Sequence, residues 1–309
     1  MTGPGSSRAF NSLTQPDRFV VVETVCVDAL PDRVRTHALM YHDAVSGDPD
    51  ASGFPGSGPA RYKLPWATFL EHLDRIADAV DGPPNTVDDL LDGARRSRWW
   101  SLTFDDGGTT ALSIGKELAR RGWRGHFFAT TSLIGEPGFL DASGIRELRS
   151  LGHVIGSHSL SHPALMSGLR EEDLVHEWCA SVASLLDVLG EEVRSASIPG
   201  GDYANSVVRA AEKAGISALF TSEPVRTARR VEGCLVIGRL SVRKNTSPTK
   251  AARAAAGHPG PWAREYAAWN LRKPLKAIGG ERYDRARSML LEKGSRRRAP
   301  GGRQSGLRD

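Results

Sequence analysis

Two short motifs contain the residues of this chain whose types and spacing could do chemistry. The first is Thr103-Phe104-Asp105-Asp106-Gly107, and the second, about fifty residues later, is His158-Ser159-Leu160-Ser161-His162. One carboxylate and two imidazoles form a ligand set that a single divalent ion such as Zn²⁺ prefers, with positions left open for water. A second carboxylate beside that ion is free to act as a base. The pattern therefore indicates metal-assisted hydrolysis.

The two aspartates are expected to have different tasks. They follow an apolar run that is typical of a strand, and adjacent side chains of extended backbone point to opposite sides. One aspartate would then bind the metal while the other holds a water molecule. Asp-Asp-Gly-Gly is also a sequence typical of a turn. The choice between a turn and a metal site therefore depends on the histidines. His158 and His162 are four residues apart, and on a helical turn they share one face and can bind the same ion.

Strand and helix patterns alternate on both sides of these motifs. Strands are predicted over 36–41, 98–104, 125–130, 153–156, 194–198, 217–221 and 235–240, and helices from Pro65 onward and over 87–95, 110–121, 143–151, 171–189 and 206–214. Such repeated units imply a mainly parallel sheet with right-handed crossovers.

The expected site residues all follow the carboxyl ends of predicted strands. This holds for Asp105, Asp106, His158, His42 and the glycine turn at 199–201. In a (β/α) barrel the active site lies at that face, because the βα loops converge there. Open α/β sheets also bind ligands past their strand ends, so the arrangement favours a barrel without excluding an open sheet.

Charge and cysteine content indicate which partner and which cellular compartment to expect. The chain of 309 residues has a formal charge of +5. Residues 294–309 contain five Arg and one Asp, a net of +4, which leaves about +1 for everything else (5 − 4). A near-neutral body with a basic tail argues against a nucleic-acid partner. Three widely spaced cysteines match neither a zinc site nor a disulfide framework, so a reducing compartment is expected.

The chain ends and the other histidines complete the expectations. The first eighteen residues are polar and lack an apolar h-region, and no apolar run is long enough to span a bilayer. We therefore expect a soluble, cytoplasmic protein. His37, His72 and His126 are expected on the surface or at the edge of the core. The predicted organisation is a disordered N-terminus (1–17), a barrel (18–248), a helical C-terminal extension (249–293) and a basic disordered tail (294–309).

The two motifs together resemble those of the polysaccharide deacetylase family, which is carbohydrate esterase family four or the nodulation-factor deacetylase homology domain. Gly125–Ala129 resembles that family's second strand and Leu39–His42 its opening strand, so the similarity covers roughly residues 36–245. The resemblance implies a distorted (β/α) barrel of the glycoside hydrolase/deacetylase type. It also implies removal of N-acetyl groups from a sugar or glycoconjugate with the help of a divalent metal ion, usually zinc.

By motif position, the resemblance implies a role for each site residue. Asp105 would be the catalytic base, and Asp106, His158 and His162 the metal ligands. Within the segment from Pro199 to Tyr203, Gly200 would supply a backbone N–H to the oxyanion. The remaining candidates for substrate contacts are Asp202 and Tyr203.

The chain departs from the family pattern at two places. Ser197 stands two residues before the proline, where the family usually has an Arg that orients the base. The late strand at 235–241 lacks the Leu-x-His that usually provides the general acid. We expect His42 to replace that acid, with His258 as a weaker candidate, and Arg239 to supply the missing orienting charge.

Two other functions are compatible with the same residues. A sugar-binding pseudoenzyme would keep the metal site but lack turnover, which the two departures favour. A non-haem iron oxygenase also uses two histidines and a carboxylate. The parallel α/β pattern and the additional Asp105 argue against the oxygenase.

Overall fold

The computed structural model describes residues 33–91, 99–201 and 203–271. The segments 1–17 and 294–309, which were expected to be disordered, lie outside this range, as do Asp202 and residues 18–32. The described part contains most of the predicted barrel (18–248) and about the first half of the predicted C-terminal extension (249–293).

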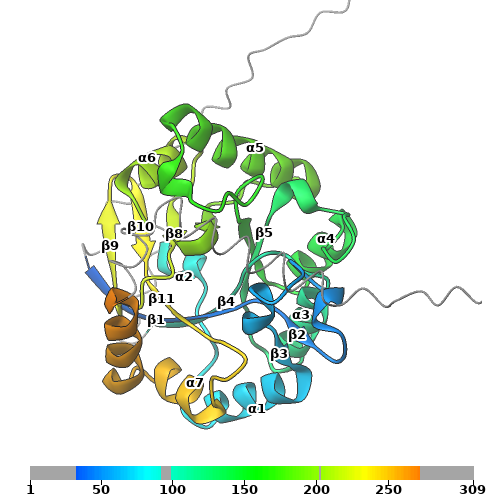
Figure 1. Cartoon of the computed structure of the whole chain (residues 1–309), viewed down its shortest axis with the longest axis vertical. Helices are drawn as coiled ribbons and strands as arrows, with labels where there is room; N and C mark the ends of the chain where they lie inside the picture. Colours follow the sequence, from blue (N-terminus) through cyan, green and yellow to red (C-terminus); the bar gives the residue numbers. More distant parts are fainter. Residues whose placement is uncertain (1–32, 92–98, 202, 272–309) are drawn as a thin grey trace, which may run out of the picture.

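The main sheet closes into a barrel at the centre of the molecule (Figure 1). Its strands follow the order β11-β1-β4-β5-β6-β7-β8-β10-β9, and β9 also pairs with β1, which closes the ring. All pairs are parallel except those of β9 with β1 and β10. The predicted fold, a distorted (β/α) barrel, is confirmed. The strands are β1 (Arg33–Tyr41), β4 (Trp99–Phe104), β5 (His126–Ala129), β6 (Val154–Ser157), β7 (Ser195–Ser197), β8 (Ala218–Phe220), β9 (Thr227–Val231), β10 (Cys234–Ile237) and β11 (Arg239–Ser241), with β2 (Ala44–Val45) and β3 (Leu64–Pro65) as a separate pair.

The last predicted strand is broken at Gly238. The sequence predicts one strand over 235–240, but the structure has β10 and β11, which pair with β8 and β1 respectively. A Cβ atom at Gly238 would lie 2.5 Å from the carbonyl oxygen of Glu223 and 2.7 Å from that of Val225. Only glycine permits this approach, and the change of direction brings Arg239 into the barrel.

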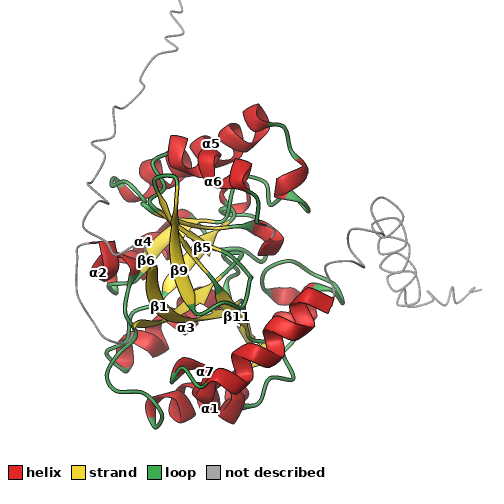
Figure 2. Cartoon of the chain, turned by 90° about the vertical axis from the view of Figure 1, so that its left-hand side faces the viewer, coloured by secondary structure: helices red, strands yellow, loops and turns green. Residues whose placement is uncertain are grey.

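Helices surround the strands and bury one face each (Figure 2). In α1, for example, Phe69, Leu73 and Ile76 are buried at helical spacing. A further helix over 259–271 follows α7. None of the helices in the described part has the length and apolar character that crossing a bilayer requires. The helices are α1 (Trp66–Ala77), α2 (Val87–Leu91), α3 (Thr110–Arg120), α4 (Ala142–Ser150), α5 (Glu171–Leu189), α6 (Asn205–Lys213) and α7 (Pro248–Ala255).

The expected position of three histidines is wrong. His72 and His126 are fully buried and His37 is 4% exposed, so none of them lies at the surface or the edge of the core. For His72 and His126, burial is tolerated because both ring nitrogens have partners. Nδ1 of His126 lies 3.1 Å from the carbonyl oxygen of Leu102, and Nε2 accepts a hydrogen bond from the backbone N–H of Val87 at 2.8 Å.

Candidate metal centre

The sheet register brings the predicted site residues to one end of the barrel. Tyr41 pairs with Phe104, so His42 and Asp105, the next residues along, emerge side by side. The backbone N–H of Asp105 donates to the carbonyl oxygen of Tyr41, at 3.1 Å. Ala129 of β5 likewise pairs with Ser157 of β6, which places His158 at the same end. The position expected for these residues, past the carboxyl ends of the strands, is therefore the observed one.

Asp106, His158 and His162 form a cluster that suits a divalent cation. One ligand atom from each lies within 4.8 Å of the others. Oδ1 of Asp106 is 3.4 Å from Nε2 of His158 and 3.7 Å from Nε2 of His162. Asp106 and His162 have φ angles of 79° and 57°, a left-handed conformation that costs roughly 1–2 kcal/mol in an L-residue. Such strain is retained where the surrounding structure holds it, often at functional sites.

The hydrogen bonds of His158 leave the correct nitrogen available for a metal. Its Nδ1 lies 2.9 Å from the carbonyl oxygen of Ser197, so Nδ1 carries the proton and donates. Nε2, which faces Asp106, is therefore the nitrogen whose lone pair is available when the ring is neutral. A backbone carbonyl that fixes the tautomer in this way is typical of metal-binding histidines. One carboxylate and two imidazoles, one of them already in the binding tautomer, fit a Zn²⁺-like ion.

Asp105 lies beside this cluster but belongs to a different network. Both its oxygens face Arg239, with Nη1–Oδ1 at 2.7 Å and Nη2–Oδ2 at 2.8 Å, and the Ser197 hydroxyl donates to Oδ2 at 3.0 Å. Arg239 is fully buried and uses all five of its N–H donors, the others going to Thr103, Thr221 and Ser197. The expectation that Arg239 faces the candidate base agrees with this geometry.

The local charges keep both aspartates ionised. Burial by itself would raise the pKa of Asp105, but Arg239 and His158 outweigh it and the net shift is downward. For Asp106, burial is likewise opposed by His42 and His158, and its pKa is also lowered. In the metal-free protein, burial lowers the pKa of His158, whereas Asp105 and Asp106 raise it, and the net shift is upward. The site is an array of strongly coupled opposite charges.

His42 lies close enough to act on both aspartates. It contributes to the lowered pKa of Asp105 and of Asp106. Its ring stacks on Tyr62 with centroids 4.7 Å apart, and its buried Nδ1 has no hydrogen-bond partner among the described residues. The ring therefore lies near both carboxylates and has one nitrogen without a hydrogen-bond partner among the described residues.

The segment after β7 contains the residues that were predicted to contact the oxyanion or the substrate. Gly200 lies in the turn that follows β7, with a φ of 64°. The ring of Tyr203 instead lies against the guanidinium of Arg229, 4.6 Å from it, and its hydroxyl donates to Asn205 at 2.6 Å. These contacts give Tyr203 a structural environment and do not support its predicted role in substrate binding. Asp202 lies outside the described residues.

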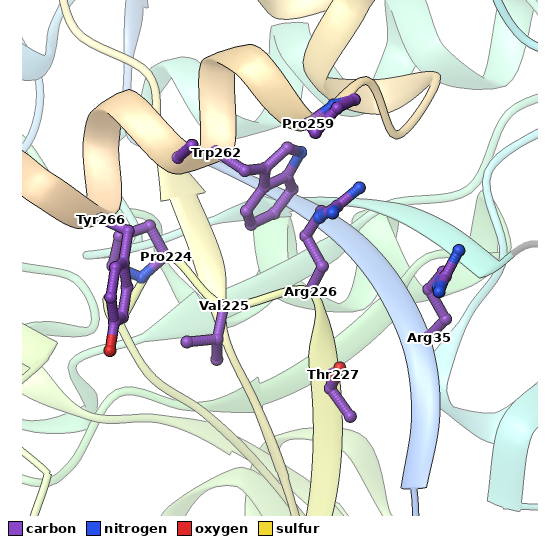
Figure 3. A pocket seen from close by; sticks show the side chains of 9 residues that line it. Arg35, Pro224, Val225, Arg226, Thr227, Pro259, Trp262 and Tyr266 are labelled. Atoms are coloured by element: carbon purple, nitrogen blue, oxygen red, sulfur yellow. The ribbon is translucent and has the colours of Figure 1, made fainter.

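A cavity of about 340 Å³ lies between β1, the segment 224–227 and the helix over 259–271 (Figure 3). It is lined by Arg35, Arg226, Trp262 and Tyr266 among others. Arg35 precedes His42 by seven residues on β1 and its extension, which at ~3.3 Å per residue places the cavity roughly 20 Å from the aspartates and histidines. The cavity is therefore separate from the metal centre.

Sequence reasoning missed several residues that complete the site. Glu177 binds the loop that carries the histidines, and Ser197 binds Asp105. Phe54 packs on His162, with ring centroids 4.6 Å apart, and Tyr62 packs on His42. Phe54 and Tyr62 come from the β1–α1 connection, whose Gly- and Pro-rich composition predicts only a loop. Of these residues, only Ser197 could have been identified from the sequence, because it stands where the family pattern has Arg.

Comparison with known proteins agrees with this geometry. Residues 92–219 match the family model for polysaccharide deacetylases. A curated Bacillus subtilis protein, YxkH, whose name places it among the polysaccharide deacetylases, is 27% identical over 147 residues. These cover 47% of this chain and 52% of YxkH, so the match spans about half of the relative.

Solved structures share the fold. A Streptococcus pyogenes deacetylase, PplD, determined with acetate, has a TM-score of 0.60 at 19% identity and covers 72% of this chain and 98% of its own. A Bacillus cereus polysaccharide deacetylase has a TM-score of 0.59 at 17% identity, covering 72% of this chain and 69% of its own. The resemblance to the polysaccharide deacetylase family that the two motifs predict is therefore confirmed.

Proposed function

We propose that this protein is a divalent-metal-dependent hydrolase that removes the N-acetyl group from an amino sugar. One observation carries the proposal. Asp106, His158 and His162 face one another within 4.8 Å, while Asp105 beside them is held separately by Arg239. A set of ligands and an independent carboxylate are what this reaction class requires. The matched family and the acetate in the PplD complex support an acetylated carbohydrate as the substrate.

Asp106, Nε2 of His158 and His162 would hold the ion, and Zn²⁺ is the first candidate for a ligand set of two nitrogens and one oxygen. When bound, such an ion polarises the acetyl carbonyl and lowers the pKa of a water molecule. The protein's own contribution is to fix the ligands, since His158 is held by the carbonyl of Ser197.

Asp105 would act as the general base. It is ionised because Arg239 and His158 outweigh the effect of burial on its pKa, so it can take the proton of the attacking water. The two bonds from Arg239 hold the carboxylate plane in one orientation. A base positioned in this way contributes about 10²–10⁴-fold to the rate.

His42 would return a proton to the leaving amine, and the backbone N–H of Gly200 would stabilise the oxyanion. His42 is suited to this task because its Nδ1 is unpartnered and its ring is held by stacking on Tyr62. If Gly200 is only a turn residue, its N–H does not contact the oxyanion. Only the rate of acetate release distinguishes these two roles.

One observation favours a second candidate function. The late strands β10 and β11, Cys234–Ile237 and Arg239–Ser241, contain no histidine, so the usual donor to the leaving group is missing. If His42 does not replace it, the protein binds metal and sugar without turnover.

A metal titration with an acetate-release assay tests both functions. The chelator-treated protein is titrated with Zn²⁺ and then incubated with a panel of N-acetylated sugars and glycoconjugates. We expect acetate release that depends on Zn²⁺. Asp106→Asn should lose Zn²⁺ binding, whereas Asp105→Asn should keep it and lose about 100-fold or more in kcat.

The same assay with His42→Ala tests the substitute acid. We expect kcat to fall about 100-fold at unchanged Zn²⁺ affinity. His176→Ala, an exposed histidine on α5, is the matched control and should behave as wild type. Full turnover in His42→Ala would refute its role, and Zn²⁺ binding with no acetate from any substrate would favour the binding protein.

A further inference from the structure

The loop between the two metal-binding histidines is held by a buried carboxylate of α5. Oε2 of Glu177 accepts the backbone N–H groups of Leu160 and Ser161, at 3.0 and 2.9 Å, and Oε1 accepts the hydroxyl of Ser161 at 2.6 Å. Glu177 is only 8% exposed, and no Lys, Arg or His of the described residues forms an ion pair with it. Since an uncompensated buried charge is costly, these three bonds supply its compensation.

The loop needs such an anchor because its backbone is strained. Ser159 and His162 have φ angles of 62° and 57°, a conformation that non-glycine residues adopt only when their surroundings hold it. Other hydrogen bonds join the loop to its own residues, to the hydroxyl of Ser157 at the end of β6, and to the segment after β5. The hydroxyl of Ser159 accepts the N–H of His162, and the carbonyls of Ser159 and Leu160 accept from Thr131 and Ser132. Glu177 is the charged partner of this loop.

The three candidate ligands differ in how they are fixed. Asp106 is the second residue after β4, and His158 directly follows β6 and is hydrogen-bonded to the carbonyl of Ser197. His162 stands at the far end of the loop, and its ring contacts are with Phe54 and His158. Its position therefore depends most on the conformation of Leu160 and Ser161.

We propose that Glu177 is the positioning residue that holds His162 in place to bind the metal. This inference rests on the proposed metal site. Glu177 touches neither the metal ligands nor the substrate in this account. It acts through the two amides that it accepts, and an outer residue of this kind typically accounts for 10–100-fold in metal affinity.

Zinc affinity measured by competition with a chromophoric chelator tests the proposal. Glu177→Gln keeps the side-chain length but leaves one acceptor oxygen and an N–H₂ group that opposes a backbone N–H. We expect Zn²⁺ affinity to fall 10–100-fold. The matched control is Ser181→Ala, one turn further along α5, whose hydroxyl contacts Ser157 of the strand at 2.6 Å and not the loop. It should lower stability in urea while leaving Zn²⁺ affinity unchanged.

A double-mutant cycle shows whether Glu177 acts through His162. If it does, Glu177→Gln in a His162→Ala background should cause no further loss of Zn²⁺ affinity. Additive losses, or wild-type affinity in Glu177→Gln, would overturn the proposal. Should Glu177→Gln not fold, Ser161→Ala removes one of the three bonds and should give a smaller loss in the same direction, and no loss would overturn it.

A metal-free measurement separates this inference from the proposed function. Hydrogen exchange of the Leu160 and Ser161 amides should accelerate at least tenfold in Glu177→Gln and stay unchanged in Ser181→Ala. If wild type binds no divalent ion, the proposed function fails while this exchange result still reports the anchor. Wild-type exchange rates in Glu177→Gln would refute the anchor even if Zn²⁺ binds.

Discussion

At the scale of single residues, the site shows how a missing charge is replaced from another strand. Ser197 stands where the family pattern has an Arg, and Arg239 of β11 reaches both Ser197 and Asp105. The guanidinium lies beside the rings of Phe128 and Phe220, 5.9 and 5.8 Å from their centroids. Its charge is compensated by the fork-to-fork pair with Asp105, the geometry that only Arg offers.

Replacing Arg239 by Lys should therefore impair both stability and catalysis. The ammonium keeps the charge but cannot form two parallel bonds, so several buried acceptors lose their donors. We expect a loss of about 3 kcal/mol in the free energy of unfolding, as for other broken buried pairs. Because Arg239 lowers the pKa of Asp105, the acidic limb of the kcat/KM profile should move to higher pH in Arg239→Lys.

Urea unfolding and a pH–rate profile measure these two effects. Arg120→Lys, whose pair with Glu117 lies on the surface, is the control and should change neither. An Arg239→Lys enzyme with an unaltered acidic limb would show that Asp105 is not the base whose ionisation limits the rate.

At the scale of elements, most of the barrel could be predicted because its signals are local. The helix over 171–189 has the predicted bounds, and Gly190 ends it with a φ of 72°. Thr86 and Asp89 cap the start of the helix predicted from residue 87, with reciprocal bonds of 2.8 and 3.2 Å. β9 was not predicted, because its antiparallel pairing with β1 and β10 is set by closure of the ring and not by its own residues.

The residues of the candidate metal site could also be predicted from the sequence, whereas the contacts that surround them could not. Asp106, His158 and His162 follow strands whose order and register are regular, so their convergence was foreseeable. The contacts of Phe54, Tyr62 and Glu177 were not, because they depend on how long loops fold over the barrel end. Tyr203 was assigned to substrate by its position in a motif, yet its packing against Arg229 depends on β9.

We expect the conformation of the β1–α1 connection to depend on one buried side chain, Lys63. Nζ of Lys63 donates to the carbonyls of Pro49, Ser52 and Phe54, at 2.7, 2.5 and 2.7 Å. Lys63→Met should cost about 2 kcal/mol, as for lost charged hydrogen bonds, and should release the segment that places Phe54 on His162. Hydrogen exchange over residues 49–54 should accelerate, with Lys116→Met, an exposed surface-pair residue, as the control. Unaltered exchange would show that Lys63 does not hold this connection.

At the scale of the whole molecule, neutral histidines in the core make the fold sensitive to acid. Burial lowers the pKa of His126 to about 4 despite its bond to the carbonyl of Leu102. Burial also lowers the pKa of His72 and His153. The unfolded chain therefore binds more protons than the native state between about pH 4 and the ordinary value of 6.5. The contribution of these histidines to the free energy of unfolding has its full value above pH 6.5 and decreases as the pH falls from 6.5 to about 4.

Urea unfolding of the metal-free protein at pH 7 and pH 5 should reveal this linkage. For His126 alone, a pKa of about 4 against an ordinary 6.5 gives a loss of about 2 kcal/mol between these pH values. The raised pKa of His158 acts in the opposite sense between pH 7 and pH 6.5, but it does so equally in wild type and in His126→Asn, so the comparison of the two isolates the effect of His126. His126→Asn should be less stable at pH 7, yet its stability should depend less on pH by about the same 2 kcal/mol. If the variant and wild type lose equal stability between pH 7 and pH 5, His126 is not held neutral, and the acid sensitivity must arise elsewhere in the barrel.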